Sequence, residues 1–313
     1  MASNARIENS LAAAVAASMG HGCPPKLAAA LRYSLFPGGG RFRPRLCLAV
    51  AMSCGEDHPD CTDAAAAAVA RACGDDRPAL ADAAAAAIEL LHCASLVHDD
   101  LPCFDDAPTR RGQASVHCAF GERLAVLVGD ALIVMPFQVL VRAAADAPER
   151  ALRVMHTIGI GVGMPGGIVA GQAWECEPRV TLREYQRLKT GSLFEAATVA
   201  GAQAAGGDAE AWRALGAHLG EAYQVADDIR DVIADPEHLG KPIGQDVALG
   251  RPSVATEQGL DAAMRIFQRL VAGAVDAVPD CRGAPMLRAL VRAESERLVP
   301  PALFAQQRLR AVA

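Results

Sequence analysis

The sequence ADAAAAAIELLHCASLVHDDLPCFDDAPTRRG, residues 81–112, holds a helix and an acidic cluster in direct succession. From Ala83 to Leu91 it contains only Ala, Ile, Glu and Leu, and neither Gly nor Pro occurs before Pro102. These residues have good or tolerable helix propensity, whereas proline is strongly unfavourable inside a helix. The stretch therefore predicts an apolar helix that leads directly into the acids.

Four carboxylates follow this helix, and the arginine pair Arg110-Arg111 comes next; the acids are Asp99, Asp100, Asp105 and Asp106. Acids that repel one another at the end of an apolar helix are costly to desolvate unless a cation neutralises them. Oxygen ligands of this kind suit Mg²⁺, which often shares its coordination shell with substrate phosphates. The motif taken alone is equally compatible with a solvated acidic loop.

A second acidic cluster lies in QVADDIRD, residues 224–231. Asp227 and Asp231 are four residues apart, so on a helix they share one face, with Asp228 beside them. Like charges at this spacing destabilise an isolated helix. Two such clusters in one chain, each on an apolar helix, predict the two walls of a metal-lined cavity.

Five motifs in this order resemble those of the trans-type polyprenyl diphosphate synthases. They are PGGGRFRP (37–44), HDDLPCFDD (98–106), RRG (110–112), KTG (189–191) and YQVADDIRD (223–231). The similarity extends to about Pro252, and within the family the chain is most similar to the geranylgeranyl diphosphate synthases of bacterial carotenoid pathways. The resemblance implies an all-α, single-domain isoprenoid-synthase bundle over residues 1–313 with a central metal-lined cavity.

The resemblance also implies a reaction, in which isopentenyl diphosphate condenses with an allylic diphosphate, farnesyl diphosphate foremost, to give geranylgeranyl diphosphate. Cations must stabilise the charge on the departing diphosphate, and an apolar cavity must keep the carbocation from water. By resemblance the Mg²⁺ ligands are Asp99, Asp100, Asp105, Asp227, Asp228 and Asp231. The candidate catalytic residues are Asp99, Asp105, Lys189, Asp227 and Asp228. Asp106 is left open between a ligand and a solvated neighbour.

Further residues match diphosphate-binding positions of the family. Paired arginines suit bidentate contacts with phosphate oxygens; Arg110 is assigned to the allylic diphosphate and Arg111 to the isopentenyl one. The other allylic positions are Lys189, Thr190, Gln224 and Lys241. The other isopentenyl positions are Arg43 and His92, and His98 is interpreted as structural. Gln172, in the family's GQ motif, is expected near the carbocation.

The sequence departs from the family pattern at three phosphate-binding positions. Gly40 replaces a lysine that belongs to the isopentenyl site, Gln245 replaces a basic residue of some relatives, and Arg251 replaces a lysine. Loss of a cation weakens phosphate binding, while arginine keeps the charge and changes the geometry. We expect an active enzyme with a raised KM for isopentenyl diphosphate.

Product length is expected to depend on residues that precede Asp99 on the helix. Ala94 and Ser95 lie about one turn below the acids and are small, whereas farnesyl-forming relatives tend to carry aromatic residues there. Leu91, with Ile88, would then form the floor of a deeper pocket. This pattern predicts a C20 product.

Composition supports a helical protein without nucleic-acid partners. The chain of 313 residues is 52% hydrophobic and 4% aromatic and carries a net charge of −6, which argues against a nucleic-acid binder.

The ten cysteines form no CxxC pair and fit reduced thiols in a cytoplasmic protein. We expect no signal peptide and no membrane span; the uncharged stretch 157–174 comes nearest to one, but glycines and Pro165 interrupt it. By resemblance alone the protein is a homodimer.

Helical patterns continue along the chain, and no convincing strand pattern occurs. Thr181 and Glu184 form a capping box at the start of the helix that carries KTG. SCGEDHPDCTDAAAAA, residues 53–68, is echoed 19 residues later, and residues 57–71 are interpreted as a duplicated surface insertion.

Three other functions remain open from the sequence. A farnesyl diphosphate synthase differs only in product length. A non-catalytic regulatory subunit would explain Gly40 but has no need of two intact acid clusters. A class I terpene cyclase typically carries an N/D-x-x-S/T-x-x-x-E motif in place of the second DDxxD, so Asp227 to Asp231 favours the synthase.

Overall fold

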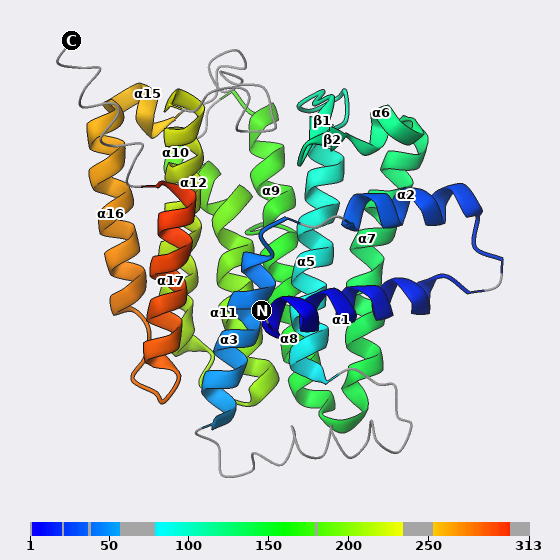
Figure 1. The fold of residues 1–313 in the computed structure, drawn as a ribbon, viewed down its shortest axis with the longest axis horizontal. Helices are drawn as coiled ribbons and strands as arrows, with labels where there is room; N and C mark the ends of the chain where they lie inside the picture. Colours follow the sequence, from blue (N-terminus) through cyan, green and yellow to red (C-terminus); the bar gives the residue numbers. More distant parts are fainter. Residues whose placement is uncertain are drawn as a thin grey trace.

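The computed structural model describes residues 2–20, 22–36, 39–56, 79–178, 181–233 and 253–300. Long helices form most of this part of the chain; most of them are roughly parallel or antiparallel to one another, and α1 and α2 lie across them (Figure 1). The longer helices are α1 (Ala2–Ser18), α2 (Pro25–Leu35), α3 (Phe42–Glu56), α5 (Leu80–Asp99), α7 (Glu122–Ala143), α8 (Pro148–Val162), α11 (Ser192–Ala205), α12 (Arg213–Ile233), α16 (Leu260–Asp276) and α17 (Ala284–Leu298). The short ones are α6 (Val116–Phe120), α9 (Ile168–Ala173), α10 (Leu182–Gln186) and α15 (Val254–Gln258). The all-α prediction is confirmed.

Helix α5 occupies the centre of the bundle because its middle is apolar except for Glu89, which is paired with Arg41. Its residues from Ala83 to Leu91 are all buried, and the helix packs against α1, α3, α7 and α11. The alanine side chains are short, so neighbouring helices can approach closely. The polar end of α5 follows only after this buried stretch, which places Asp99 and Asp100 at one end of the bundle.

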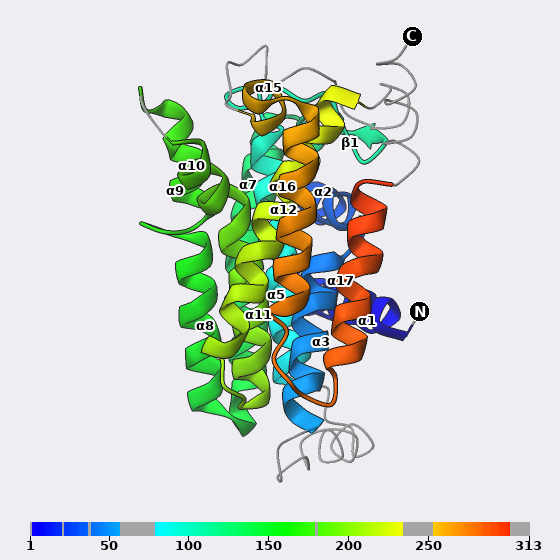
Figure 2. The same ribbon diagram turned by 90° about the vertical axis from the view of Figure 1, so that its left-hand side faces the viewer.

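Helix α11 connects the two halves of the bundle. It packs against α3, α5 and α8 on one side and against α12 on the other. Helix α12 in turn packs against α16, which lies beside α17 (Figure 2). Helices α5 and α12 both end at the same end of the molecule, so the two acidic clusters face the same region (Figure 1).

Some local predictions were wrong. A two-stranded antiparallel hairpin, β1 (Thr109–Arg110) and β2 (Gln113–Ala114), follows the first acidic cluster. Strands of two residues are too short to produce an alternating pattern in the sequence. A π-helix, Arg187–Gly191, interrupts the helix that carries KTG. The capping box is confirmed, because the amide of Glu184 donates to Oγ1 of Thr181 at 3.3 Å.

Within the described ranges, two helices, α5 and the stretch from Glu122 to Asp146, are long and apolar enough to span a membrane by length and composition. The earlier choice of residues 157–174 as the most membrane-like stretch was therefore wrong. Core packing accounts for α5, since 67% of its apolar window is buried, against 44% for the stretch that contains α7. The eight described cysteines are all free thiols. The duplicated stretch 57–71 lies outside the described residues.

Candidate active site

The first acidic cluster lies where α5 ends, in a loop that folds back onto the helix. Asp99 is the last helical residue, and the amide of Asp105 donates to the Asp99 carbonyl at 2.9 Å. The amide of Ala107 donates to the Asp100 carbonyl at 3.2 Å. Pro102 therefore lies in a turn that follows the helix. This turn brings Asp105 next to Asp99.

Asp99 and Asp100 are held in different electrostatic surroundings. Burial raises the pKa of Asp99 to about 6; Lys189 and Arg110 oppose the shift, and Asp105 and Glu175 add to it. Asp100 is buried and forms an ion pair with Arg110, whose Nε donates at 2.9 Å. Burial also raises the pKa of Asp100, although Arg110 opposes the shift, so an additional cation would stabilise the charged forms of both carboxylates.

The second acidic cluster lies near the end of α12, and its members differ in their contacts. Asp228 is buried and accepts hydrogen bonds from Nε2 of Gln186, Nε2 of Gln224 and the amide of Val254, at 3.2, 3.2 and 2.8 Å. Asp227 forms an ion pair with Arg230 one turn away. Asp231 is partly buried.

The π-helix Arg187–Gly191 lies between the two acidic clusters. Within it, Oγ1 of Thr190 donates to Oε1 of Gln224 on α12 at 2.9 Å, and Nζ of Lys189 lies 2.6 Å from Oε1 of Glu175. The Lys189 charge also acts on Asp99 at the end of α5. A π-helical turn shifts the register of side chains and is frequent at functional sites. Here one segment contacts α12 through Thr190, while the charge of its Lys189 acts on Asp99 at the end of α5.

Sequence reasoning missed several polar residues that hold this site. Glu175 accepts hydrogen bonds from Lys189 and from Tyr185, and its Oε2 accepts from Nε2 of Gln172 at 2.9 Å. Gln186 orients Asp228. Glu175 lies three residues after Gln172, so an acid within one turn of the GQ motif was the signal that could have found it.

The donor set of the two clusters fits Mg²⁺. Every predicted ligand is a carboxylate, the donor that this ion prefers. Burial raises the pKa of Asp99, so a cation beside it would stabilise its charged form. In the described part of the chain, no three His, Cys, Asp or Glu side chains gather closely enough to hold a metal by themselves. Mg²⁺ usually keeps waters and substrate phosphate oxygens in its shell, so two separate walls of carboxylates suit it.

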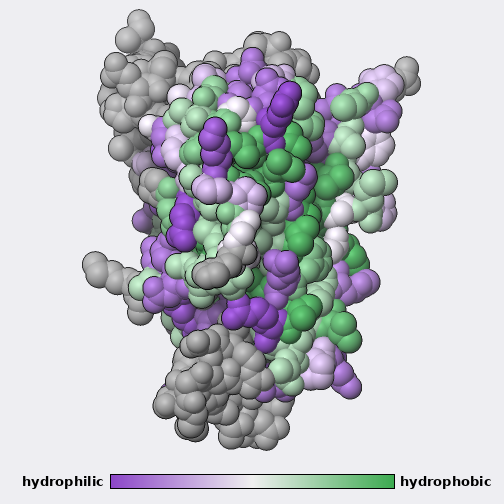
Figure 3. All heavy atoms as spheres, turned by 90° about the vertical axis from the view of Figure 1, so that its right-hand side faces the viewer, coloured by the Kyte–Doolittle hydropathy of each residue, from purple (hydrophilic) through white to green (hydrophobic). Residues whose placement is uncertain are grey.

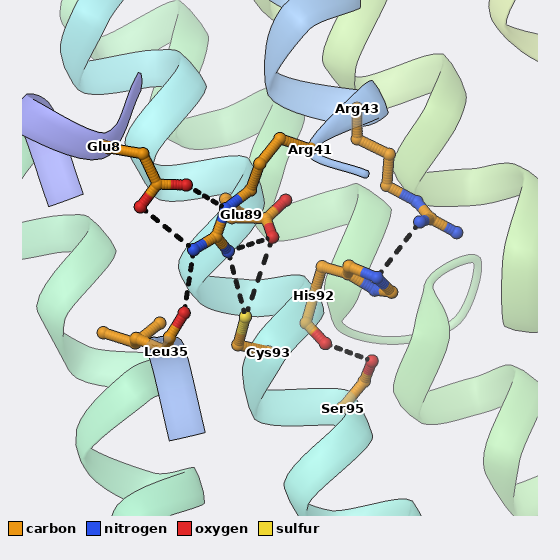
Figure 4. Close-up of polar contacts among 8 residues, drawn as sticks. All are labelled: Glu8, Leu35, Arg41, Arg43, Glu89, His92, Cys93 and Ser95. Carbon is orange, nitrogen blue, oxygen red and sulfur yellow. Dashed lines mark hydrogen bonds and ion pairs between the residues drawn. The ribbon is translucent and has the colours of Figure 1, made fainter. Parts of the chain in front are cut away.

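Arg43 and His92 form the core of a second, positively charged region (Figure 4). Nη1 of Arg43 lies 3.2 Å from Nε2 of His92, and the Arg43 guanidinium lies 4.3 Å from the centroid of the Phe194 ring. Burial, followed by the charges of Arg43, Arg111, Arg110 and Arg41, holds the pKa of His92 well below its usual value. His92 is therefore neutral at pH 7, and its Nε2 accepts the hydrogen bond from Arg43. Nε of Arg43 is buried without a hydrogen-bond partner among the described residues.

Arg41, two residues earlier, has a different place (Figure 4). Its guanidinium donates to Glu8 on α1 at 2.8 Å, to Glu89 on α5 at 2.6 Å and to the carbonyl of Leu35 at 2.8 Å. Burial alone would lower the pKa of Arg41, but Glu8 and Glu89 raise it. Arg41 joins three helices and does not face the charged region around Arg43.

The residues expected to set product length lie on α5 before the acids. Ala94 and Leu91 are buried in the core cluster around α5, as is Ile88. Ser95 is partly buried, and its hydroxyl donates to the carbonyl of His92 at 2.9 Å. Gly40 is exposed next to Arg41. Lys241, Gln245 and Arg251 lie outside the described residues.

Comparisons with known proteins show the family of the chain. The family described as Polyprenyl synthetase matches residues 24–272. A geranylgeranyl diphosphate synthase of Cereibacter sphaeroides is 51% identical over 98% of this chain and 100% of the relative. Another, of Rhodobacter capsulatus, is 45% identical over 96% of this chain and 97% of the relative.

Two solved structures of geranyltransferases are also similar to this chain. A geranyltransferase of Helicobacter pylori, complexed with magnesium and isoprenyl diphosphate, superposes with a TM-score of 0.72 at 28% identity and covers 88% of each chain. A geranyltransferase of Legionella pneumophila has a TM-score of 0.75 at 26% identity and covers 95% of this chain and 94% of its own.

Proposed function

Because the chain belongs to the polyprenyl synthetase family, we propose that it condenses isopentenyl diphosphate with an allylic diphosphate, farnesyl diphosphate foremost, to geranylgeranyl diphosphate and diphosphate. One observation carries the proposal. The π-helix that holds Lys189 contacts α12 beside Asp228, while the Lys189 charge reaches Asp99 on α5. These observations support one site that is made of the two acidic clusters and a cation, as ionisation of a diphosphate ester requires.

The allylic diphosphate is proposed to lie between the acidic clusters. Mg²⁺ held by Asp99, Asp100, Asp105, Asp227, Asp228 and Asp231 would neutralise charge on the leaving diphosphate. Lys189 and Arg110 add fixed positive charge there, and Thr190 and Gln224 add polar contacts. Lys241 is assigned to the same diphosphate as a prediction from the sequence. Fixed charges that need no rearrangement stabilise the developing diphosphate in the transition state.

Isopentenyl diphosphate is proposed to bind around Arg43 and His92, with Arg111 nearby. These side chains give a region with positive charge in which the imidazole remains neutral. When the allylic C–O bond breaks, the double bond of isopentenyl diphosphate attacks the carbocation and forms the new C–C bond. A proton then leaves the product carbon, and the departing diphosphate is its acceptor. Gln172 is assigned to the neighbourhood of the cation.

The C20 product follows from the small side chains at 94 and 95. Neither carries a ring that would stop the growing chain one turn below the acids, so the tail is proposed to extend toward Leu91. A farnesyl-forming enzyme is the second candidate, because nothing but the depth of the pocket separates the two.

The outer face of α7 supports the proposal of a homodimer. Leu127, Val134 and Val141 are exposed by half or more at intervals of seven residues, and Phe137 lies between them. Leu152 and Ile160 on α8 are also exposed. Figure 3 shows apolar side chains gathered along this side of the molecule. A seven-residue apolar interval is the pattern of a helix–helix seam, and a second copy of the chain is the proposed partner on this surface.

We also propose that the enzyme is cytoplasmic and acts in carotenoid biosynthesis.

Product analysis tests the function. Purified protein receives Mg²⁺, isopentenyl diphosphate and dimethylallyl, geranyl or farnesyl diphosphate in turn. We expect a C20 product from one or more of these primers. A C15 product would keep the enzyme class and contradict the deep pocket. No product from any primer would instead support a non-catalytic subunit.

A further inference from the structure

Two guanidinium groups from distant parts of the chain lie against the backbone of Gly39 and Gly40. A Cβ atom built on Gly39 would lie 2.9 Å from Cζ of Arg111. A Cβ built on Gly40 would lie 3.1 Å from Nη2 and 3.3 Å from Cζ of Arg297, on α17. A side chain at position 40 would therefore project directly against a second arginine, Arg297.

Arg297 is held in this place by Glu294 and Tyr223. Its Nε donates to Oε2 of Glu294 at 3.1 Å, and its Nη2 lies at 2.5 Å from Oε1 of the same carboxylate. Glu294 is buried and accepts a hydrogen bond from the hydroxyl of Tyr223. The guanidinium of Arg43 lies 5.7 Å from the centroid of the Tyr223 ring. One carboxylate and one tyrosine thus connect Arg297 to Arg43.

Arg297 remains accessible to a ligand. Among the described residues its guanidinium is hydrogen-bonded to Glu294 and Tyr223, and half of the side chain, 52%, is exposed. Arginine presents five donors, and a guanidinium already oriented by a carboxylate loses less entropy when it binds a phosphate. Together with Arg111 over Gly39, it places two cations over two consecutive glycines, next to Arg43 in the following helix.

We propose that Arg297 is a binding residue for the diphosphate group of isopentenyl diphosphate, and that Gly40 makes room for it. The proposal rests on the function proposed above and concerns one substrate of that site. The sequence predicted that the glycine at 40 weakens isopentenyl binding. On this proposal it does not, because Arg297 on α17 supplies a cation in the space next to Gly40. Glu294 is a positioning residue that orients Arg297.

Calorimetric titration with isopentenyl diphosphate alone, where no turnover occurs, tests the proposal directly. A charge-assisted hydrogen bond contributes about 1.5–3 kcal/mol, equivalent to a factor of about ten or more in affinity. We expect Arg297→Gln to raise the Kd and the KM for isopentenyl diphosphate about tenfold and to leave the KM for farnesyl diphosphate within about twofold. Arg297→Lys should retain part of the affinity. Arg292→Gln, an exposed arginine on the same helix, serves as the matched control and should match the wild type.

A double-mutant cycle with position 40 gives a second, independent readout. Gly40→Lys alone places a side chain and a second cation against Arg297 and should weaken isopentenyl binding. In the Arg297→Gln background the same lysine has space and less repulsion, and it should restore much of the lost affinity. The effect of Gly40→Lys on isopentenyl affinity should thus be unfavourable in the wild type and favourable in Arg297→Gln. Two unrelated structural changes would not produce this reversal.

Two results would overturn the proposal. One is an unchanged Kd for isopentenyl diphosphate in folded Arg297→Gln. The other is an equal loss for both substrates together with a lowered Tm, which would make the Arg297–Glu294 pair purely structural. If the wild type forms no prenyl product, the proposed function fails, and the calorimetric Kd values still decide whether Arg297 binds the diphosphate.

Discussion

Nζ of Lys189 lies 2.6 Å from Oε1 of Glu175, so a side chain assigned to the allylic diphosphate is already held by an acid. The same Oε1 accepts from the Tyr185 hydroxyl at 2.5 Å, and Oε2 accepts from Gln172. Glu175 therefore fixes three side chains from three neighbouring segments. The lysine is oriented before substrate binds, and this reduces the entropy that binding costs.

Replacement of Glu175 should disturb the allylic side of the site selectively. Glu175→Ala leaves Lys189, Tyr185 and Gln172 without their shared acceptor, and we expect kcat/KM for the allylic substrate to fall about tenfold or more, the cost of a lost charged hydrogen bond. Steady-state kinetics with each substrate varied in turn measures this. Glu177→Gln, an exposed acid two residues on, is the control. An equal change in the KM for isopentenyl diphosphate would contradict the assignment.

The buried pair Arg41–Glu89 should be costly to break from one side. Arg41→Met leaves Glu89, which is 1% exposed, without its cation, and we expect a loss of about 3–5 kcal/mol in unfolding free energy. Arg41→Met combined with Glu89→Leu should recover much of this loss, because an apolar pair of similar volume leaves no buried charge. Denaturant unfolding of both variants and of Arg45→Met, on the same helix, decides the matter. Equal stability of the single and double variants would argue against a coupled pair.

His92 should make stability depend on pH in a defined direction. Its pKa in the folded protein is lower than in the unfolded chain, so the unfolded state binds a proton first as the pH falls. Stability is then fully present above the unfolded value of about 6.5 and decreases below it, by at most about 1.4 kcal/mol per pH unit. His92→Asn should no longer show this decrease in stability at low pH. His156→Asn, which replaces an exposed histidine, should still show it. Unfolding free energies at pH 7.5 and pH 5.5 give the comparison; identical pH dependence in wild type and His92→Asn would refute it.

Aromatic residues below the acids should shorten the product. Ala94→Phe or Ala94→Tyr introduces a ring one turn before Asp99, and we expect the main product to change from C20 to C15. Ala94 is buried at 2% exposure, so this variant should also lose stability through overpacking, by about 1–3 kcal/mol. Ser95→Phe, at a partly buried position, is the companion variant. Product chromatography together with Tm separates the two effects; C20 from folded variants would place the floor elsewhere.

Charges on the outer face of α7 should dissociate the proposed dimer. Val134→Glu and Val141→Glu place an acid in an apolar contact surface, and a buried unpaired carboxylate is strongly unfavourable. We expect light scattering to give the mass of one chain for these variants and of two for the wild type. Met286→Glu, a similarly exposed apolar position on α17, is the control. A wild type of single-chain mass would exclude this assembly.

Much of the fold could be predicted from local patterns. The helix from Leu80 to Asp99, the capping contact of Thr181 and the helical setting of Asp227 follow from propensity and spacing within a few turns. Local patterns were insufficient for the hairpin that carries Arg110 and for the π-helix at Lys189. The first contains too few residues to show a period, and the second is a change in hydrogen-bond register that depends on the neighbouring helices.

The sequence by itself determined which chemical groups are available: two carboxylate clusters, paired arginines and small residues below the acids. Only the tertiary structure decided their partners. Helix packing buries Arg41 against Glu89, pairs Lys189 with Glu175 and places Arg297 over Gly40. These contacts join residues far apart in the chain, and no local propensity specifies them. Spacing fixes which side chains share a helix face, but the packing of helices against one another determines which charges meet.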